Sequence, residues 1–165
     1  MGLREDLERV TVQERELQLN RLDAHSAWDL GVQLRTMAVD RSLSVVIDVR
    51  RFGQPLFYTA LEGTTPDNAE WVRRKSNLVA RLHRSSYAVG LSLKMKSETL
   101  LEKYALSAAD YVAHGGSFPL TVIGAGVIGS VTVSGLPQRA DHELVVEALC
   151  AHLGQDYSKL AIAKA

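Results

Sequence analysis

Residues 121–135 read TVIGAGVIGSVTVSG and contain GAGVIG, a match to the G-x-G-x-x-G pattern of dinucleotide-binding loops. Such a loop needs a helix directly after the glycines, because the helix N-terminus holds the pyrophosphate. The residues after Gly126 are instead β-branched and alternate in polarity, and a Gly-Leu-Pro breaker then ends the run. The stretch therefore predicts two strands, 119–123 and 126–134, joined by a tight turn at Gly124. It does not predict a site for NAD or FAD.

Capping residues, breakers and apolar spacing divide the rest of the chain into elements. Thr11-x-x-Glu14 resembles a capping box, and Thr65-Pro66 supplies an N-cap followed by a proline. The expected elements are helices at 11–22, from Asp23 or Ser26 to about 40, at 66–84, at 97–105, from Ser107 onward and at 139–153 with Gly154 as its stop, and a β-hairpin between Ser44 and Leu61. Residues 88–96 fit either a strand or a helix. No repeat or linker interrupts this series, so one α/β domain over residues 1–165 is expected.

Length and composition narrow the class of protein. The chain has 165 residues, of which 46 % are hydrophobic, and 19 basic residues balance 19 acidic ones. It is long enough to bury one core, and it has no net charge that would attract nucleic acid. No apolar run approaches the roughly 18 residues of a membrane span, and the charged N-terminus does not resemble a signal peptide. With Cys150 as its lone cysteine, the chain is expected to be cytoplasmic, with no nucleic-acid or membrane partner.

Two segments taken together resemble a known family. The matching positions are Gly115, Gly116, Phe118, Pro119, the hairpin glycines, Val133-Ser134-Gly135 and Asp141-His142, and, within EWVRRKSNLVARLHRSSYAVG, Trp71, Arg74, Lys75, Asn77, Ser85 and Ser86. This pattern resembles the UPF0303 family, within the haem-degrading HbpS/GlcG-like (DUF336) superfamily, over roughly residues 40–153. The resemblance implies an αβα layered, profilin-like α+β fold with a mainly antiparallel central sheet flanked by helices. It places N-terminal helices in 1–40 and the family core in 41–155, and it implies homo-oligomers and haem as the ligand of some relatives.

His114 and His142 are the side chains best placed for chemistry, since both lie beside glycine-rich backbone at element boundaries. A neutral imidazole ligates haem iron or acts as a general base near pH 7. Asp141 adjoins His142, and Asp110 precedes His114 by one helical turn, where a carboxylate orients the ring. A structural interpretation stays open, in which Asp141 is an N-cap, His142 belongs to the first helical turn and His114 closes a helix.

Glycines and basic residues near these histidines suggest an anion site. The Gly-Gly-Ser backbone forms either a nest for a carboxylate or phosphate or a simple turn into the next strand. The basic helix around Arg73 either recognises an anion or is a solvated face. No G-x-S-x-G or H-E-x-x-H pattern supports a serine nucleophile or a metal site. The expected ligand contacts are Gly115, Gly116, Ser117, Phe118, Arg74 and Lys75.

The sequence therefore favours a homo-oligomeric protein that binds a small anionic ligand such as haem where HGGSFP (114–119) meets Asp141-His142. One alternative is an enzyme that uses His114 or His142 as acid and base, with Asp141 beside it, on a small anionic substrate. The other is an oligomeric scaffold or interaction protein.

Overall fold

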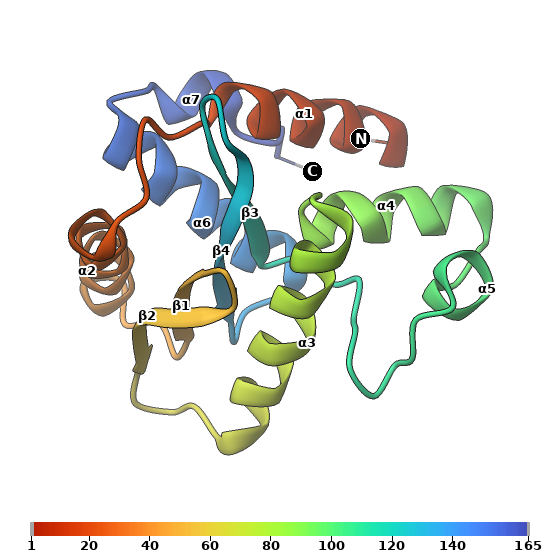
Figure 1. Cartoon of the computed structure of the whole chain (residues 1–165), viewed down its shortest axis with the longest axis horizontal. Helices are drawn as coiled ribbons and strands as arrows, with labels where there is room; N and C mark the ends of the chain where they lie inside the picture. Colours follow the sequence, from red (N-terminus) through yellow and green to blue (C-terminus); the bar gives the residue numbers. More distant parts are fainter. Residues whose placement is uncertain (1, 165) are drawn as a thin grey trace.

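The centre of the protein is a four-stranded antiparallel sheet with strand order β2-β1-β4-β3 (Figure 1). The computed structural model describes residues 2–164. Its elements are α1 (Leu3–Glu16), α2 (Ala24–Asp40), β1 (Val46–Arg51), β2 (Gln54–Ala60), α3 (Pro66–Leu82), α4 (Ser86–Lys96), α5 (Leu100–Tyr104), β3 (Ser117–Val122), β4 (Gly126–Ser134), α6 (Gln138–Leu153) and α7 (Tyr157–Leu160). Helices α2 and α6 cover one face of the sheet and α3 covers the other. This confirms the expected αβα layered fold.

The glycine stretch that resembles a dinucleotide loop is a β-hairpin. β3 and β4 pair antiparallel, and the turn between them holds Gly124 at φ +84° and Gly126 at φ +89°. Glycine adopts these left-handed values without strain. At Gly129 a Cβ atom would overlap the backbone oxygen of Arg50, so this glycine lets β4 approach β1 closely. The predicted hairpin is confirmed, and the element after the glycines is a strand that offers no helix N-terminus to a pyrophosphate.

The two faces of the sheet differ in polarity, because successive side chains of a strand point to opposite faces. The face toward α2 and α6 contributes apolar side chains to the main core, among them Ile47, Val49, Phe118, Val131 and Val133. The face toward α3 carries buried polar side chains, namely Asp48, Ser117, Ser130, Thr132 and Ser134. Buried polar groups need hydrogen-bond partners. The layer between α3 and the sheet is therefore where charged and hydroxyl groups are held inside the protein.

Several predicted helix ends are confirmed by their caps. The Asp23 carboxylate accepts a hydrogen bond from the Ser26 amide at 2.8 Å and begins α2. Thr65 precedes α3, whose first residue is Pro66, and Gly154 ends α6 in the left-handed conformation. Residues 88–96, which fitted a strand or a helix, lie in α4.

Two expectations about helices are wrong. The first helix begins at Leu3 rather than Thr11, whose hydroxyl donates to the Leu7 carbonyl at 2.8 Å inside the helix. No helix follows Ser107, because residues 107–111 form a single turn closed on the Ser107 carbonyl. Both predictions were based on a capping pattern alone, and Ser and Thr side chains also form hydrogen bonds within helices and turns.

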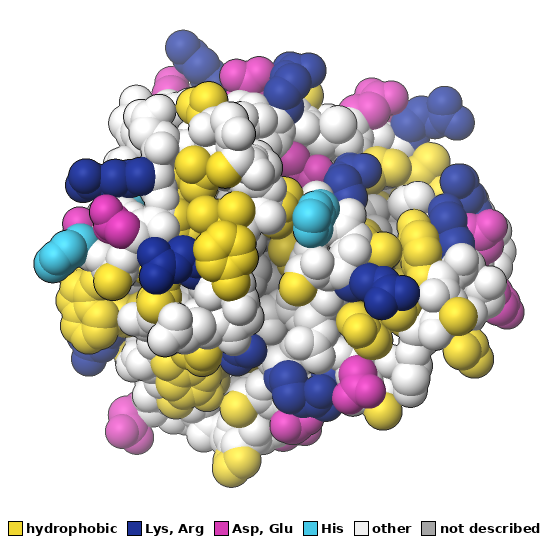
Figure 2. Space-filling view, in the orientation of Figure 1, with side chains coloured by type: hydrophobic (Ala, Val, Ile, Leu, Met, Phe, Trp, Pro, Cys, Tyr) yellow, Lys and Arg dark blue, Asp and Glu magenta, His cyan; other side chains and the backbone are white. Residues whose placement is uncertain are grey.

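Charged side chains of both signs are interspersed over the face drawn in Figure 2, with hydrophobic side chains between them. This distribution agrees with the balance of 19 basic and 19 acidic residues. Among residues 2–164, no helix has the length and apolar character needed to cross a membrane.

Candidate functional site

Two hollows meet at His114. The larger, which we call the apolar pocket, measures about 570 Å³ and lies between α4, α5 and the loop that leads to β3. The smaller, the polar pocket, measures about 230 Å³ and lies between the N-terminal halves of α3 and α6. Both are lined by His114 and Gln138, so these two residues form the wall that the pockets share. The other side chains of the apolar pocket include Leu91, Leu93, Lys94, Leu100, Leu106 and Tyr111.

The His114 ring lies against Trp71, with ring centroids 5.3 Å apart and an angle of 28° between the planes. Partial burial lowers the pKa of His114, and the positive charges of Lys75 and Arg74 lower it further. The imidazole is therefore neutral at pH 7. Asp110 does not orient this ring as expected, because its carboxylate accepts a hydrogen bond from Arg73 at 3.0 Å.

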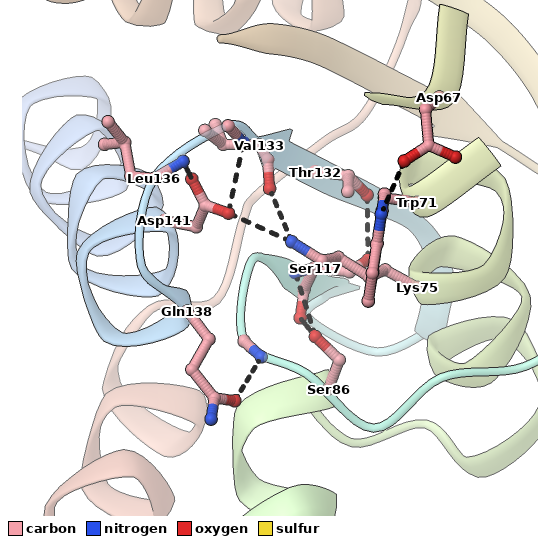
Figure 3. Close-up of polar contacts among 12 residues, drawn as sticks. Asp67, Trp71, Lys75, Ser86, Ser117, Thr132, Val133, Leu136, Gln138 and Asp141 are labelled. Carbon is pink, nitrogen blue, oxygen red and sulfur yellow. Dashed lines mark hydrogen bonds and ion pairs between the residues drawn. The ribbon is translucent and has the colours of Figure 1, made fainter. Parts of the chain in front are cut away.

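A buried ion pair forms the floor of the polar pocket (Figure 3). The Lys75 ammonium donates to Asp141 Oδ2 at 3.0 Å and to the Val133 carbonyl at 3.2 Å. Asp141 also accepts from the amides of Leu136 at 2.9 Å and Gly135 at 3.4 Å. Burial lowers the pKa of Lys75 and raises the pKa of Asp141, each against the attraction of the partner charge. Asp141 therefore holds the loop before α6 and is not the N-cap of that helix.

Two amides of the Gly-Gly-Ser segment are engaged by side chains within the protein. The Gly115 amide donates to Gln138 Oε1 and the Ser117 amide donates to Ser86 Oγ, each at 3.0 Å. A backbone nest with these donors engaged has little left to offer a ligand. Gly116, at φ +136°, leaves space for the ion pair, since a Cβ atom there would lie 2.7 Å from Lys75 Nζ.

His142 is a core residue and is not brought together with His114. Its side chain is fully buried, and its ring lies 5.0 Å from that of Tyr87 and 5.8 Å from that of Phe118. Nε2 is hydrogen bonded to Gln13 Oε1 at 2.7 Å. Burial, with a smaller effect of Arg139, lowers the pKa of His142 to about 3. An acid–base role for His142 near pH 7 does not fit this position, and Phe118 and Ser117 are likewise buried away from both pockets.

The basic stretch of α3 does not form one solvated face. Lys75 is 3 % exposed inside the protein. Arg74 lies over the Trp71 ring at 4.5 Å, and Arg84 pairs with Glu14 at 2.6 Å. The helical spacing does indicate that Lys75 is buried, because this residue falls between Val72 and Val79 on the buried stripe of the helix.

Sequence reasoning missed Asn68 and Gln138 as lining residues, as well as the whole apolar pocket. That pocket forms only when α4, α5 and the 105–114 loop come together. No local sequence pattern indicates such an arrangement. Within residues 2–164, no three His, Cys, Asp or Glu side chains gather as a metal site would require.

Comparison with known proteins identifies the family. The sequence model described as "Haem degrading protein HbpS-like" matches residues 22–150. The UPF0303 protein of Paraburkholderia phytofirmans is 61 % identical over 165 residues, covering 100 % of both chains, and that of Burkholderia thailandensis is 58 % identical over 164 residues, covering 99 % of both.

Solved structures share the fold. The crystal structure of the Ybr137w protein superposes with a TM-score of 0.82 at 29 % identity, covering 90 % of this chain and 88 % of that one. A structure described as a PduOC:heme complex has a TM-score of 0.68 at 17 % identity, covering 79 % and 94 % of the two chains, and so shows likeness of fold alone. With relatives this similar along their whole length, the chain belongs to the UPF0303 family of HbpS-like proteins.

Proposed function

We propose that the protein binds haem, or a planar anionic molecule of similar size, in the apolar pocket with His114 at its edge. The observation that carries this proposal is the position of His114 on the wall between an apolar hollow and a polar pocket floored by the Lys75–Asp141 ion pair. A ligand with an apolar body and a polar edge meets both environments at once.

The residues present fit haem in three respects. The apolar pocket, at about 570 Å³, is within the roughly 300–1,000 Å³ of small-molecule sites, and its leucines suit a porphyrin ring. A neutral imidazole is a common axial ligand of haem iron. Lys94 at the rim offers a cation to a propionate. Bound haem would supply an iron centre for ligand exchange and redox chemistry, and His114 would hold it.

The family and one neighbour agree with this choice, since the family model is named for haem degradation and the PduOC structure is described as a heme complex. His142 is engaged in the core. We therefore propose that His114, and not His142, would hold the iron of a bound haem.

Titration of the purified protein with haemin, followed at the Soret band, tests the proposal. We expect saturation at one haem per chain, and loss of the shifted band in His114→Ala. His25→Ala is the matched control, because His25 is an exposed histidine on α2 and is expected to leave the spectrum unchanged. A wild-type protein without a Soret shift, or a His114→Ala variant with the wild-type spectrum, would refute haem binding at this site.

A second candidate function is an enzyme that uses His114 as acid and base on a small anion in the polar pocket. The specific observation in its favour is that the first turns of α3 and α6, whose N-termini favour negative charge, border that pocket, with the Lys75–Asp141 pair at its floor. Inorganic phosphate is a suitable probe, read out by the NMR shifts of the His114 ring. No perturbation at millimolar phosphate would remove this candidate.

We also infer a homo-oligomer, because large apolar side chains are exposed, with Trp28 at 56 %, Phe52 at 78 % and Tyr58 at 48 %. Contiguous exposed apolar surface commonly marks interfaces, and Phe52 in the β1–β2 turn and Tyr58 on β2 belong to one hairpin. Sedimentation at micromolar concentration is expected to give more than one chain per particle, and a monomer would refute the inference. A cytoplasmic location completes the proposal, and cell fractionation tests it.

A further inference from the structure

A third hollow, which we call the hairpin pocket, lies on the polar face of the sheet. It measures about 220 Å³ and is bounded by the β1–β2 turn, the start of β4 and the last turns of α3. It shares no lining residue with the apolar or the polar pocket. In Figure 2 the surface is hollowed between the β1–β2 turn and α3.

Arg50 is held in this pocket by a buried carboxylate. Its Nε atom donates to Asp48 Oδ1 at 2.8 Å, and the Asp48 side chain is fully buried whereas that of Arg50 is 23 % exposed. Nη1 and Nη2 of Arg50 make no hydrogen bond to any other residue of the range 2–164. A guanidinium fixed through Nε presents its Nη1–Nη2 edge as two parallel donors, and this geometry matches a carboxylate. Ser130, directly opposite Arg50 on β4, lines the same pocket with a further hydroxyl donor.

Phe52, at the rim of the hairpin pocket, is not the residue that its own turn favours. Phe52 and Gly53 form the β1–β2 turn at φ +49° and +76°, values typical of the two central positions of a type I′ turn. Such turns favour asparagine at the first position, and a bulky residue with positive φ is strained. Phe52 is nonetheless there, 78 % exposed, with its amide bonded to the Ile128 carbonyl at 2.8 Å. The chain therefore keeps an aromatic ring at the mouth of a pocket at a cost to its own turn.

We propose that the hairpin pocket is a binding site for a small carboxylate that carries an apolar group. The carboxylate lies on the Nη1–Nη2 edge of Arg50 with the Ser130 hydroxyl beside it, and the apolar group lies between Phe52 and Ile128. The volume of about 220 Å³ is below the roughly 300–1,000 Å³ of drug-sized sites, so the ligand is small. No Asp or Glu is among the lining residues, and the buried Asp48 carboxylate binds Nε of Arg50 rather than its Nη1–Nη2 edge. This site is independent of the haem proposal, whereas Phe52 is also one of the exposed side chains from which a homo-oligomer is inferred above.

Benzoate is the probe, because it combines a carboxylate with one apolar ring. Titration followed by ¹H–¹⁵N NMR is expected to shift the Arg50 Nε–H signal and the amides of Ser130 and Ala80 in a saturable way. Benzamide, which is neutral and of the same shape, is expected to leave them in place. Phenylphosphonate is the third arm, since it has the same ring as benzoate but carries one more oxygen, and the two oxygens of a carboxylate match the Nη1–Nη2 edge of Arg50.

Variants separate binding from folding. Phe52→Asn is expected to keep or raise the melting temperature, because asparagine suits the turn, and to weaken benzoate binding at least fivefold. Asp48→Asn/Arg50→Met removes both partners together, since Arg50→Met alone would strand a buried carboxylate, and is expected to weaken binding at least tenfold. Arg51→Met is the matched control, because Arg51 is the next residue on the strand, faces the other side and donates to the Leu22 carbonyl.

Each remaining outcome decides against the proposal. Wild-type protein without saturable shifts at millimolar benzoate overturns it, as does wild-type affinity in the Asp48→Asn/Arg50→Met protein. Equal binding of benzamide, or tighter binding of phenylphosphonate than of benzoate, overturns the assignment of a carboxylate. Phe52→Asn that changes the oligomeric state and leaves benzoate affinity intact assigns Phe52 to an interface between copies instead.

Discussion

Replacing Lys75 by methionine tests whether the ion pair beneath the polar pocket stabilises the fold. Methionine keeps most of the apolar stem and removes the ammonium, so Asp141 remains buried with only the amides of Leu136 at 2.9 Å and Gly135 at 3.4 Å as donors. Removing one partner of a buried pair costs about 3–5 kcal/mol, and we expect about 3 kcal/mol because these two donors remain. At roughly 2–4 °C per kcal/mol for a chain of this size, the melting temperature should fall by about 6–12 °C.

The pH dependence of this loss gives the sharper test. Burial already raises the pKa of Asp141 above its usual 3.8, and loss of the Lys75 charge raises it further. A carboxyl whose folded pKa is raised favours the folded state at low pH and loses that contribution as pH rises through the folded pKa. The deficit of Lys75→Met relative to wild type should therefore shrink as the pH falls from neutral toward 3.8.

Chemical denaturation from pH 7 to pH 4, together with the double variant Lys75→Met/Asp141→Asn, measures both effects. We expect the double variant to recover more than about 1 kcal/mol of the single-variant loss. Lys103→Met is the control, since Lys103 is an exposed lysine paired with Glu98 at 3.4 Å and should leave stability unchanged within error. A loss below about 1 kcal/mol, or a deficit that does not vary with pH, would refute the account of a buried, mutually dependent pair.

Three further outcomes are expected. In His142→Gln the free energy of unfolding should fall less than in wild type as the pH drops from 6.5 to about 3. The reason is that the wild-type imidazole stays neutral in the folded protein over that range but becomes charged in the unfolded chain. A pH profile identical to wild type in urea denaturation would contradict this. Gly116→Ala should lower stability by more than about 2 kcal/mol, since its Cβ would overlap the Val133 carbonyl at φ +136°. Gly124→Ala at φ +84°, with open space around it, should cost only about 1 kcal/mol, and equal losses would show that crowding at Gly116 is unimportant. Millimolar NAD should leave the melting temperature unchanged, because a strand follows the GAGVIG glycines; a concentration-dependent rise would contradict the hairpin interpretation.

The parts of the fold that could be predicted are those determined by residues adjacent in the sequence. The hairpin at Gly124, the cap at Asp23 and the stop at Gly154 each depend on the conformation of a few adjacent residues. These local requirements can be recognised in a single sequence.

The parts that could not be predicted depend on partners far along the chain. The imidazole of His142 is matched to Gln13, which lies 129 positions away. Asp141 finds Lys75 at a separation of 66 positions, and nothing near either residue indicates the other. Site residues were sought at element boundaries and on the basic helix, whereas several of them are buried in the interior beside the pockets.

The linker between α1 and α2 has a consequence for how copies of this chain can join. Leu19 forms a parallel bridge to Val122, with its amide bonded to the Thr121 carbonyl at 2.8 Å and its carbonyl to the Ile123 amide at 2.9 Å. The outer edge of β3 is thus occupied near its end by the chain's own backbone, whereas β2 terminates the other side of the sheet. Extension of the sheet through the β2 edge, by a second β2 related through a twofold axis, would close on itself. Such an extension would end at a pair and would not propagate into a filament.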